Sequence, residues 1–226
     1  MTNISELEVC VFDAYGTLFD VNSAAESCKE DIGSNWEEFA MLWRDKQLQY
    51  SWLRTLMGEY IAFWQVTQDA LDYALKTFNI DDKRIRSNLL EVYFILKSYP
   101  EVRATLEKLK NHGIRSVILS NGSEDMLEAA IENSGIIDLL HGVYSVDSVQ
   151  VFKPHPKAYE LPQVKLGFIS EKMYFFSSNA WDACGAQNFG FQTYWINRFN
   201  HEQENLPGNK LYQIPDLSAV PGLLGI

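Results

Sequence analysis

Residues 9–18 read VCVFDAYGTL, and this stretch decides the fold. Four apolar residues at 9–12 run directly into Asp13, and Gly16 and Thr17 follow within a few positions. A short apolar run that ends in turn-forming residues is typical of a buried strand. The stretch therefore predicts a strand whose end carries a carboxylate, that of Asp13, in a position where a catalytic group could lie.

Strands and helices alternate in the chain after Pro100. The predicted strands lie at 116–119, near Val143, at 174–176 and at 193–196, with helices to about His112, to about Ser134, from Pro156 and before Thr193. Gly113 and Gly135 follow the first two helices, as C-terminal caps do. Such alternation predicts an α/β fold with a mainly parallel sheet that is covered by helices on both faces. The tail from Asn200 is predicted to be a loop.

Residues 22–99 have a different character. They are rich in aromatic and charged residues, contain no convincing strand, and repeat apolar residues at spacings of three and four. This pattern is typical of packed amphipathic helices. We therefore predict a helical cap at 22–99, inserted into a core that consists of residues 1–21 and 100–226.

Polar residues follow four of the predicted segments. Ligands bind outside the carboxyl ends of the strands in sheets of this kind. The residues at these ends are Asp13; Ser120 and Asn121; Lys153, in the loop after the strand near Val143; and the SSN segment at 177–179. Their convergence predicts one functional site at this edge of the sheet.

Composition and charge limit the partners of the chain. Its 226 residues, 46% of them hydrophobic, are enough for a buried core. The net charge of −11 argues against a nucleic-acid partner, because phosphate binding needs clustered Lys and Arg. Three cysteines without CxxC spacing predict neither a disulfide framework nor a structural metal, and they favour a reducing cytoplasm. No apolar run approaches the length of a membrane-spanning helix, so no membrane association is expected.

Four motifs together resemble the haloacid dehalogenase superfamily: DAYGTLFD at 13–20, LSNGS at 119–123, VFKP at 151–154 and SSNAWD at 177–182. LWRDKQLQYSWLR at 42–54 also resembles the cap of the type II L-2-haloacid dehalogenases, so the resemblance covers essentially the whole chain. It implies a Rossmann-like core with an inserted helical cap. The implied reaction converts short-chain (S)-2-haloalkanoic acids to (R)-2-hydroxy acids with inversion at C2, through an aspartyl ester and without a cofactor or metal.

The resemblance also implies roles for the residues of the motifs. Asp13 would be the nucleophile, and Lys153 would pair with it and favour its ionised form. Asp182, with Asn179 nearby, would hold Lys153 and orient or deprotonate the hydrolytic water. Which group acts as the base is left open.

The residues that would bind the substrate come from both parts of the chain. Arg44 and Asn121 would receive the halide, because positive charge aimed at a developing anion stabilises the transition state. Phe63 and Trp181 would form apolar walls, although aromatic packing in a core explains these two equally well. The substrate carboxylate would be received by the residues Ser120, Tyr15 and Gly16 (through backbone N–H groups), Tyr159 and Ser177.

Two other classes of protein stay open. Phosphatases of the superfamily carry a second acid two residues after the nucleophile and use magnesium, but this position is Tyr15 here. A halide leaves as an anion and needs no general acid, so Tyr15 favours a dehalogenase. A non-catalytic binding protein on this scaffold would be expected to have lost part of the set, yet Asp13, Arg44, Ser120, Asn121, Lys153 and Asp182 are all present.

The cap also raises the question of assembly. Its aromatic residues around Tyr50, Trp52, Tyr60 and Trp64 could supply the apolar interface of a homodimer, or they could form the core of the cap itself. The sequence does not indicate which halogen or which chain length is preferred.

Overall fold

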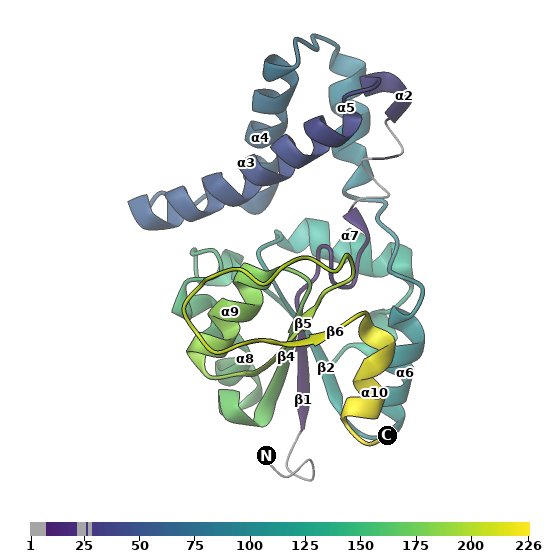
Figure 1. Cartoon of the computed structure of the whole chain (residues 1–226), viewed down its shortest axis with the longest axis vertical. Coiled ribbons are helices and arrows are strands. Elements are labelled where there is room, and N and C mark those ends of the chain that lie inside the picture. The colour runs from purple at the N-terminus through teal and green to yellow at the C-terminus, as the bar shows by residue number, and fades with distance from the viewer. Residues whose placement is uncertain (1–7, 22–25, 27–28) are drawn as a thin grey trace.

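The core of the molecule is a parallel sheet. The computed structural model describes residues 8–21, 26 and 29–226, and within them it has a six-stranded sheet of order β3-β2-β1-β4-β5-β6 in which every neighbouring pair is parallel (Figure 1). The strands are β1 (Val9–Phe12), β2 (Arg115–Ser120), β3 (Gly142–Ser145), β4 (Met173–Ser177), β5 (Gln192–Ile196) and β6 (Tyr212–Ile214). The predicted α/β fold with a parallel sheet is confirmed.

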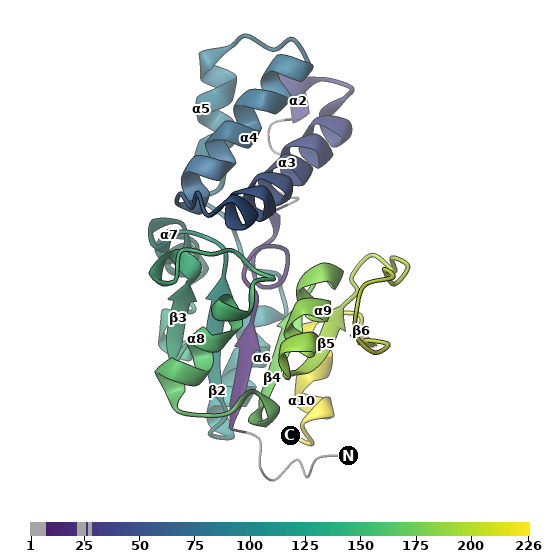
Figure 2. The ribbon, with the colours of Figure 1, turned by 90° about the vertical axis from the view of Figure 1, so that its left-hand side faces the viewer.

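Helices cover both faces of the sheet. α8 and α9 lie on one face, and α6 and α10 lie on the other (Figures 1 and 2). The helices are α2 (Lys29–Ile32), α3 (Trp36–Met57), α4 (Phe63–Thr77), α5 (Lys83–Val92), α6 (Val102–Asn111), α7 (Glu124–Ser134), α8 (Pro156–Leu166), α9 (Ala180–Phe189) and α10 (Val220–Leu223), with the single turns η2 (Ile137–Leu139), η3 (Val146–Ser148), η4 (Ser170–Lys172) and η5 (Leu217–Ala219). None of these helices is long and apolar enough to cross a membrane.

The apolar run of β1 is explained by burial on both faces. Val9 and Val11 belong to the cluster that includes Tyr159 of α8. Cys10 and Phe12 belong to the cluster on the opposite face, which the helices α6 and α7 share. Successive side chains of a strand point to opposite faces of the sheet. In a strand covered on both faces every side chain is buried, so each position favours an apolar residue.

The prediction that the tail from Asn200 is a loop was wrong in part. β6 pairs with β5, with Tyr194 opposite Tyr212 and Ile196 opposite Ile214. Pro221 lies in the first turn of α10, where the missing N–H of proline leaves no helical hydrogen bond unmade. β6 has three residues and its Tyr212 is exposed, so the sequence shows no alternation of apolar and polar residues that would predict a strand here.

The helices α2 to α5 stand beyond the carboxyl ends of the strands (Figures 1 and 2). The chain enters and leaves this region through two segments that pair with each other: the N–H of Asp20 donates to the carbonyl oxygen of Lys97 (2.9 Å), and that of Tyr99 donates to Leu18 (2.9 Å). The domain boundaries near 21 and 100 stay a prediction, since 22–25 and 27–28 lie outside the described residues.

Buried polar side chains connect the cap helices. The amide of Gln47 on α3 donates to the hydroxyl of Thr67 on α4 (2.9 Å) and accepts from the hydroxyl of Tyr93 beyond α5 (3.0 Å). The indole N–H of Trp43 donates to the carbonyl oxygen of Thr67 (3.0 Å). Since a buried polar group without a partner costs free energy, these bonds select one mutual arrangement of the three helices.

Candidate active site

Asp13 lies directly after β1 and is almost fully buried. Its Oδ1 accepts a hydrogen bond from Nζ of Lys153 (2.9 Å). Its Oδ2 accepts from Oγ1 of Thr17 (3.0 Å), Nδ2 of Asn179 (3.0 Å) and Oγ of Ser177 (3.4 Å). Donors surround the carboxylate, so its two oxygens are held in fixed positions.

The ammonium of Lys153 is buried between two carboxylates. Besides Asp13, Nζ donates to Oδ2 of Asp182 (2.7 Å) and to the carbonyl oxygen of Leu119 (3.1 Å), so all three of its protons are used. Burial lowers the pKa of Lys153, but Asp13 and Asp182 raise it by more, and its net pKa lies above the ordinary value. The predicted grouping of these three side chains is present in the structure.

Tyr159 lies behind this group rather than beside a substrate. Its hydroxyl donates to Oδ1 of Asp182 (2.7 Å), and its side chain is fully buried. This position differs from the predicted contact with the substrate carboxylate, because the hydroxyl proton is already used. Burial raises the pKa of Asp182, while the Lys153 ammonium and the Tyr159 hydrogen bond lower it. The net pKa of Asp182 lies above its ordinary value, and Tyr159 is a positioning residue whose hydrogen bond opposes this rise.

Asn179 connects the cap to the nucleophile. While Nδ2 of Asn179 donates to Asp13, its Oδ1 accepts from a guanidinium nitrogen of Arg44 on α3 (3.4 Å). Among the described residues, no carboxylate forms an ion pair with Arg44. Its contact is with a neutral amide, so its charge is available to an anion.

Ser120 and Asn121 lie at the end of β2. Oδ1 of Asn121 accepts from the backbone N–H of Lys153 (2.8 Å), which orients the amide and fixes the lysine loop. Oγ of Ser120 accepts from the N–H of Gly122 (3.0 Å), and this bond leaves the hydroxyl proton unused. Both side chains are where the sequence predicts them, at the same edge as Asp13.

The aromatic residues predicted to form walls also serve packing. Phe63 is buried, and its ring meets that of Phe152 edge to face, with 5.9 Å between the centroids. Phe152 is the residue directly before Lys153. Trp181 packs edge on to Trp52 of α3 at 5.4 Å, and its indole N–H has no hydrogen-bond partner among the described residues. Trp181 therefore contacts the cap, and its indole N–H can donate to a ligand.

Tyr15 fills the position where related phosphatases carry an acid. Its hydroxyl is buried and has no hydrogen-bond partner among the described residues, and burial raises its pKa. A Cβ on Gly122 would lie 2.5 Å from the Tyr15 ring, so only glycine admits the ring here. Gly16 adopts φ +84°, and a Cβ there would lie 3.0 Å from Oγ of Ser178, so the turn after Asp13 also requires glycine.

Sequence reasoning gave no role in the site to Thr17, and it named Ser178 only as part of the SSN segment at 177–179. The Thr17 hydroxyl accepts from the N–H of Ser178 (2.8 Å) and donates to Asp13, so it joins the turn after β1 to the turn after β4. Their presence in the GTL and SSN segments was the available signal. The pairing depends on two strands that are adjacent only in the folded chain.

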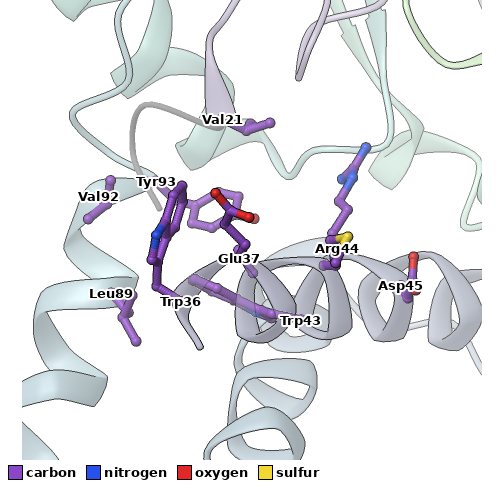
Figure 3. A pocket seen from close by; sticks show the side chains of 11 residues that line it. Val21, Trp36, Glu37, Trp43, Arg44, Asp45, Leu89, Val92 and Tyr93 are labelled. Carbon is purple, nitrogen blue, oxygen red and sulfur yellow. The ribbon is translucent and has the colours of Figure 1, made fainter. Parts of the chain in front are cut away.

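A cleft of about 350 Å³ lies between cap and core. Its lining includes Tyr15, Arg44, Asn179 and Trp181. A second cavity of about 460 Å³ shares Arg44 with this cleft. In Figure 3 the Arg44 side chain projects from α3, and Trp36, Glu37 and Tyr93 lie to one side of it. Volumes of this order suit small molecules.

Further contacts between cap and core were also missed. The hydroxyl of Tyr60, after α3, donates to Asp147 in η3, and the Thr55 hydroxyl accepts from the N–H of Phe152 (3.0 Å). The Tyr60 ring lies 4.9 Å from that of Phe152. The cap thus contacts the loop that carries Lys153, and no local pattern in the sequence indicates it.

The parallel α/β sheet places a buried aspartate after its first strand with a lysine against it, and a carboxylate held in this way can serve as a nucleophile. The family described as haloacid dehalogenase-like hydrolase matches residues 7–190 of the chain. The chain therefore belongs to the haloacid dehalogenase-like hydrolases.

Known proteins of this family are similar over nearly the full chain. The (S)-2-haloacid dehalogenase 1 of Pseudomonas sp. (strain CBS-3) is 43% identical, with 96% of each chain covered. Haloacetate dehalogenase H-2 of Moraxella sp. (strain B) is 39% identical, covering 99% of this chain and 100% of that one. The structure of L-2-haloacid dehalogenase from Xanthobacter autotrophicus with chloropropionic acid covalently bound matches with a TM-score of 0.90 and 35% identity, covering 97% of this chain and 98% of that one.

The contact between Tyr159 and Asp182 predicts a shift in the pH profile. Replacing Tyr159 by Phe removes a hydrogen bond that lowers the pKa of Asp182, so this pKa rises. We expect Asp182 to act in its ionised form on the hydrolytic water, so the acid limb of kcat should move to higher pH, with little change on the alkaline side. Tyr174→Phe, which removes a hydroxyl from β4 away from the Lys153 pair, is the control. An unmoved acid limb in Tyr159→Phe contradicts the positioning role.

Proposed function

We propose that the chain hydrolyses short-chain (S)-2-haloalkanoic acids to (R)-2-hydroxy acids through an ester of Asp13. The observation that carries this proposal is the Asp13 carboxylate, which Lys153 holds at 2.9 Å beside a cleft that also contains Arg44. The relatives named above act on haloacids or haloacetate, and one of them holds chloropropionic acid covalently. They support the same chemistry for this chain.

In the first step a carboxylate oxygen of Asp13 attacks C2 of the substrate from the side opposite the halogen. A C–O bond forms, the carbon–halogen bond breaks, and the halide leaves with the bonding electrons. Lys153 holds Oδ1 of Asp13, and Asn179, Thr17 and Ser177 limit the positions that Oδ2 can take. One displacement at C2 inverts its configuration.

In the second step water attacks the carbonyl carbon of the Asp13 ester. The bond between this carbon and the ester oxygen breaks, which returns the carboxylate and releases the hydroxy acid. Asp182 is the carboxylate next to Lys153, and it is held by Tyr159. We assign Asp182 and Asn179 to positioning and activating the water.

The halide would leave toward Arg44. Its guanidinium, the amide of Asn121 and the indole N–H of Trp181 are donors that can meet a developing anion. Phe63, which packs on Phe152, would supply an apolar wall. The predicted Gly16 N–H already donates to the carbonyl oxygen of Phe19 (2.8 Å). The substrate carboxylate would bind to the Ser120 hydroxyl, Ser177 and the backbone N–H of Tyr15.

A metal-dependent phosphatase is the alternative. Tyr15 argues against it, because its buried phenol has a raised pKa and replaces the acid that would protonate a leaving alcohol. The carboxylates of Asp13 and Asp182 are also both engaged by the Lys153 ammonium, which takes oxygens that a magnesium ion would need.

We also place the chain in the reducing cytoplasm. Cys10 and Cys184 are free thiols, while Cys28 lies outside the described residues. Free buried thiols are common in proteins that do not meet an oxidising compartment. Alkylation in intact cells should label these thiols after denaturation without prior reduction, and a disulfide would contradict this location.

The nucleophile assignment predicts complete loss of turnover in Asp13→Asn. Halide release from (S)-2-chloropropionate, measured with EDTA present, should fall to background, while Asp125→Asn on the exposed start of α7 keeps the wild-type rate. In a single turnover in water labelled with heavy oxygen, the label should enter Asp13 and not the product. A labelled product, or equal release from the (R)-isomer, would contradict the proposed mechanism, and magnesium-dependent phosphate release without halide would favour the phosphatase.

The halide site predicts a defect in the first step of Arg44→Ala. Loss of one such donor typically lowers the rate by ~10²–10³, so single-turnover halide release should slow by about that factor. Arg54→Ala is the matched control, since Arg54 lies on the same helix, pairs with Asp69 at 3.5 Å and does not line the cleft. Equal single-turnover rates in the two variants count against the halide site.

The surface of α3 supports a homodimer. The aromatic residues Trp52, Tyr60 and Trp64 pack against other rings of the same chain, but Leu56 and Met57 are 82% and 64% exposed at the end of the helix. An exposed apolar patch of this kind is typical of an interface. Sedimentation velocity should give a dimer for the wild type and a monomer for Leu56→Glu. A monomeric wild type at micromolar concentration contradicts the assembly.

A further inference from the structure

Arg198 makes three contacts in a nearly buried position. It follows β5, and its side chain is 9% exposed. One guanidinium nitrogen pairs with Oε1 of Glu101 at 2.6 Å, and another donates to the backbone carbonyl oxygen of Thr17 at 3.0 Å. The group also lies over the ring of Tyr99, 3.7 Å from its centroid. Such a fixed arginine needs an explanation, because ordering a long side chain costs entropy.

The partners of Arg198 belong to the two segments through which the chain passes between core and cap. Thr17 lies in the segment that leaves the core, and Tyr99 and Glu101 lie in the one that returns. Backbone hydrogen bonds already pair these segments at Leu18 and Tyr99. One planar guanidinium therefore contacts both segments at once, which its fixed fork of donors allows.

Thr17 transmits this contact to the reacting carboxylate. Its hydroxyl donates to Oδ2 of Asp13 (3.0 Å), and its N–H, like those of Leu18 and Phe19, donates to the carbonyl oxygen of Ala14 (3.2, 2.8 and 3.0 Å). The turn is compact, so a shift of the Thr17 carbonyl group moves the hydroxyl as well.

The charge of Arg198 is used within the protein. Although Arg198 lines the same cleft as Arg44, Glu101 neutralises it at 2.6 Å and Thr17 occupies a second donor. Arg44 has no such ion pair among the described residues. The geometry thus separates the two arginines: Arg44 is free to meet an anion, and Arg198 holds the turn that carries the nucleophile.

We propose that Arg198 is a positioning residue for Asp13, acting through the backbone carbonyl of Thr17 and through the paired segments between core and cap. This inference rests on the proposed function where it concerns turnover. The hydrogen bonds of Arg44, Asn121 and Ser120 do not involve Arg198, so its removal should lower the rate of chemistry and not the binding of substrate.

The test compares Arg198→Met with Arg103→Met. Arg103 makes the same kinds of contact on the surface, with an ion pair to Glu107 (3.0 Å) and a bond to the carbonyl oxygen of Gly135 (2.6 Å), and it lies away from the site. In Arg198→Met, kcat and the single-turnover rate of halide release should fall about tenfold or more with KM within about threefold of wild type. Arg103→Met should keep wild-type values. Arg198→Lys should recover part of kcat, because an ammonium retains the charge but lacks the fork.

A raised KM with an unchanged kcat in Arg198→Met would overturn the inference, since Arg198 would then bind substrate. Equal kinetics in Arg198→Met and Arg103→Met would overturn it as well. Should Arg198→Met not fold, by circular dichroism, Arg198→Lys takes its place, and a smaller reduction of kcat than the one expected for Arg198→Met, at constant KM, is the expected result.

A second readout does not depend on activity. In the absence of substrate, hydrogen exchange of the amides of Leu18 and Phe19 should be faster in the Arg198 variant than in Arg103→Met, while the exchange of the β1 amides is unchanged. Unchanged exchange at the turn overturns the inference even if the chain releases no halide. Failure of the wild type to release halide would instead refute the proposed function alone.

Discussion

The buried ammonium of Lys153 is the interaction on which the site depends. An uncompensated charge in the interior costs several kcal/mol, so this side chain is stable there only with its partners in place. Those partners come from three elements: Asp13 after β1, the carbonyl of Leu119 in β2, and Asp182 in α9. One cation therefore fixes where two strand ends and one helix meet.

The topology of the sheet brings these elements together. β1 pairs with β2 on one side and with β4 on the other, so the strand order reverses at β1. Reversal of this kind leaves a crevice at the carboxyl end of the strand, because the following connections run in opposite directions. Asp13 follows β1 directly, and Figure 2 shows the cap helices beyond the carboxyl ends of the strands. The strand order therefore determines where the site lies, and the individual side chains determine its chemistry.

The strand ends could be predicted from the sequence because each is a local signal. An apolar run followed by Asp13, or by Ser120 and Asn121, indicates a strand and its polar end without knowledge of the rest. The direction of Tyr159 could not be predicted, since its hydroxyl meets Asp182 only when α8 and α9 pack together. The same holds for β6, which is a strand only through its pairing with β5.

Charge near the cleft decides which ligand is accepted, although the whole chain carries −11. Interactions between exposed charges are largely screened beyond about 8 Å at physiological salt. The acidic surface therefore has little influence inside a cleft whose nearest unpaired cation is Arg44, and the neutral Asn179 leaves that charge undiminished. Lys153 and Arg198 lie close by, but carboxylates compensate both. Among the residues that the structure describes, Arg44 is the cation at this cleft without an ion pair, so the site suits a substrate with a single carboxylate and a departing halide better than a doubly charged phosphate ester.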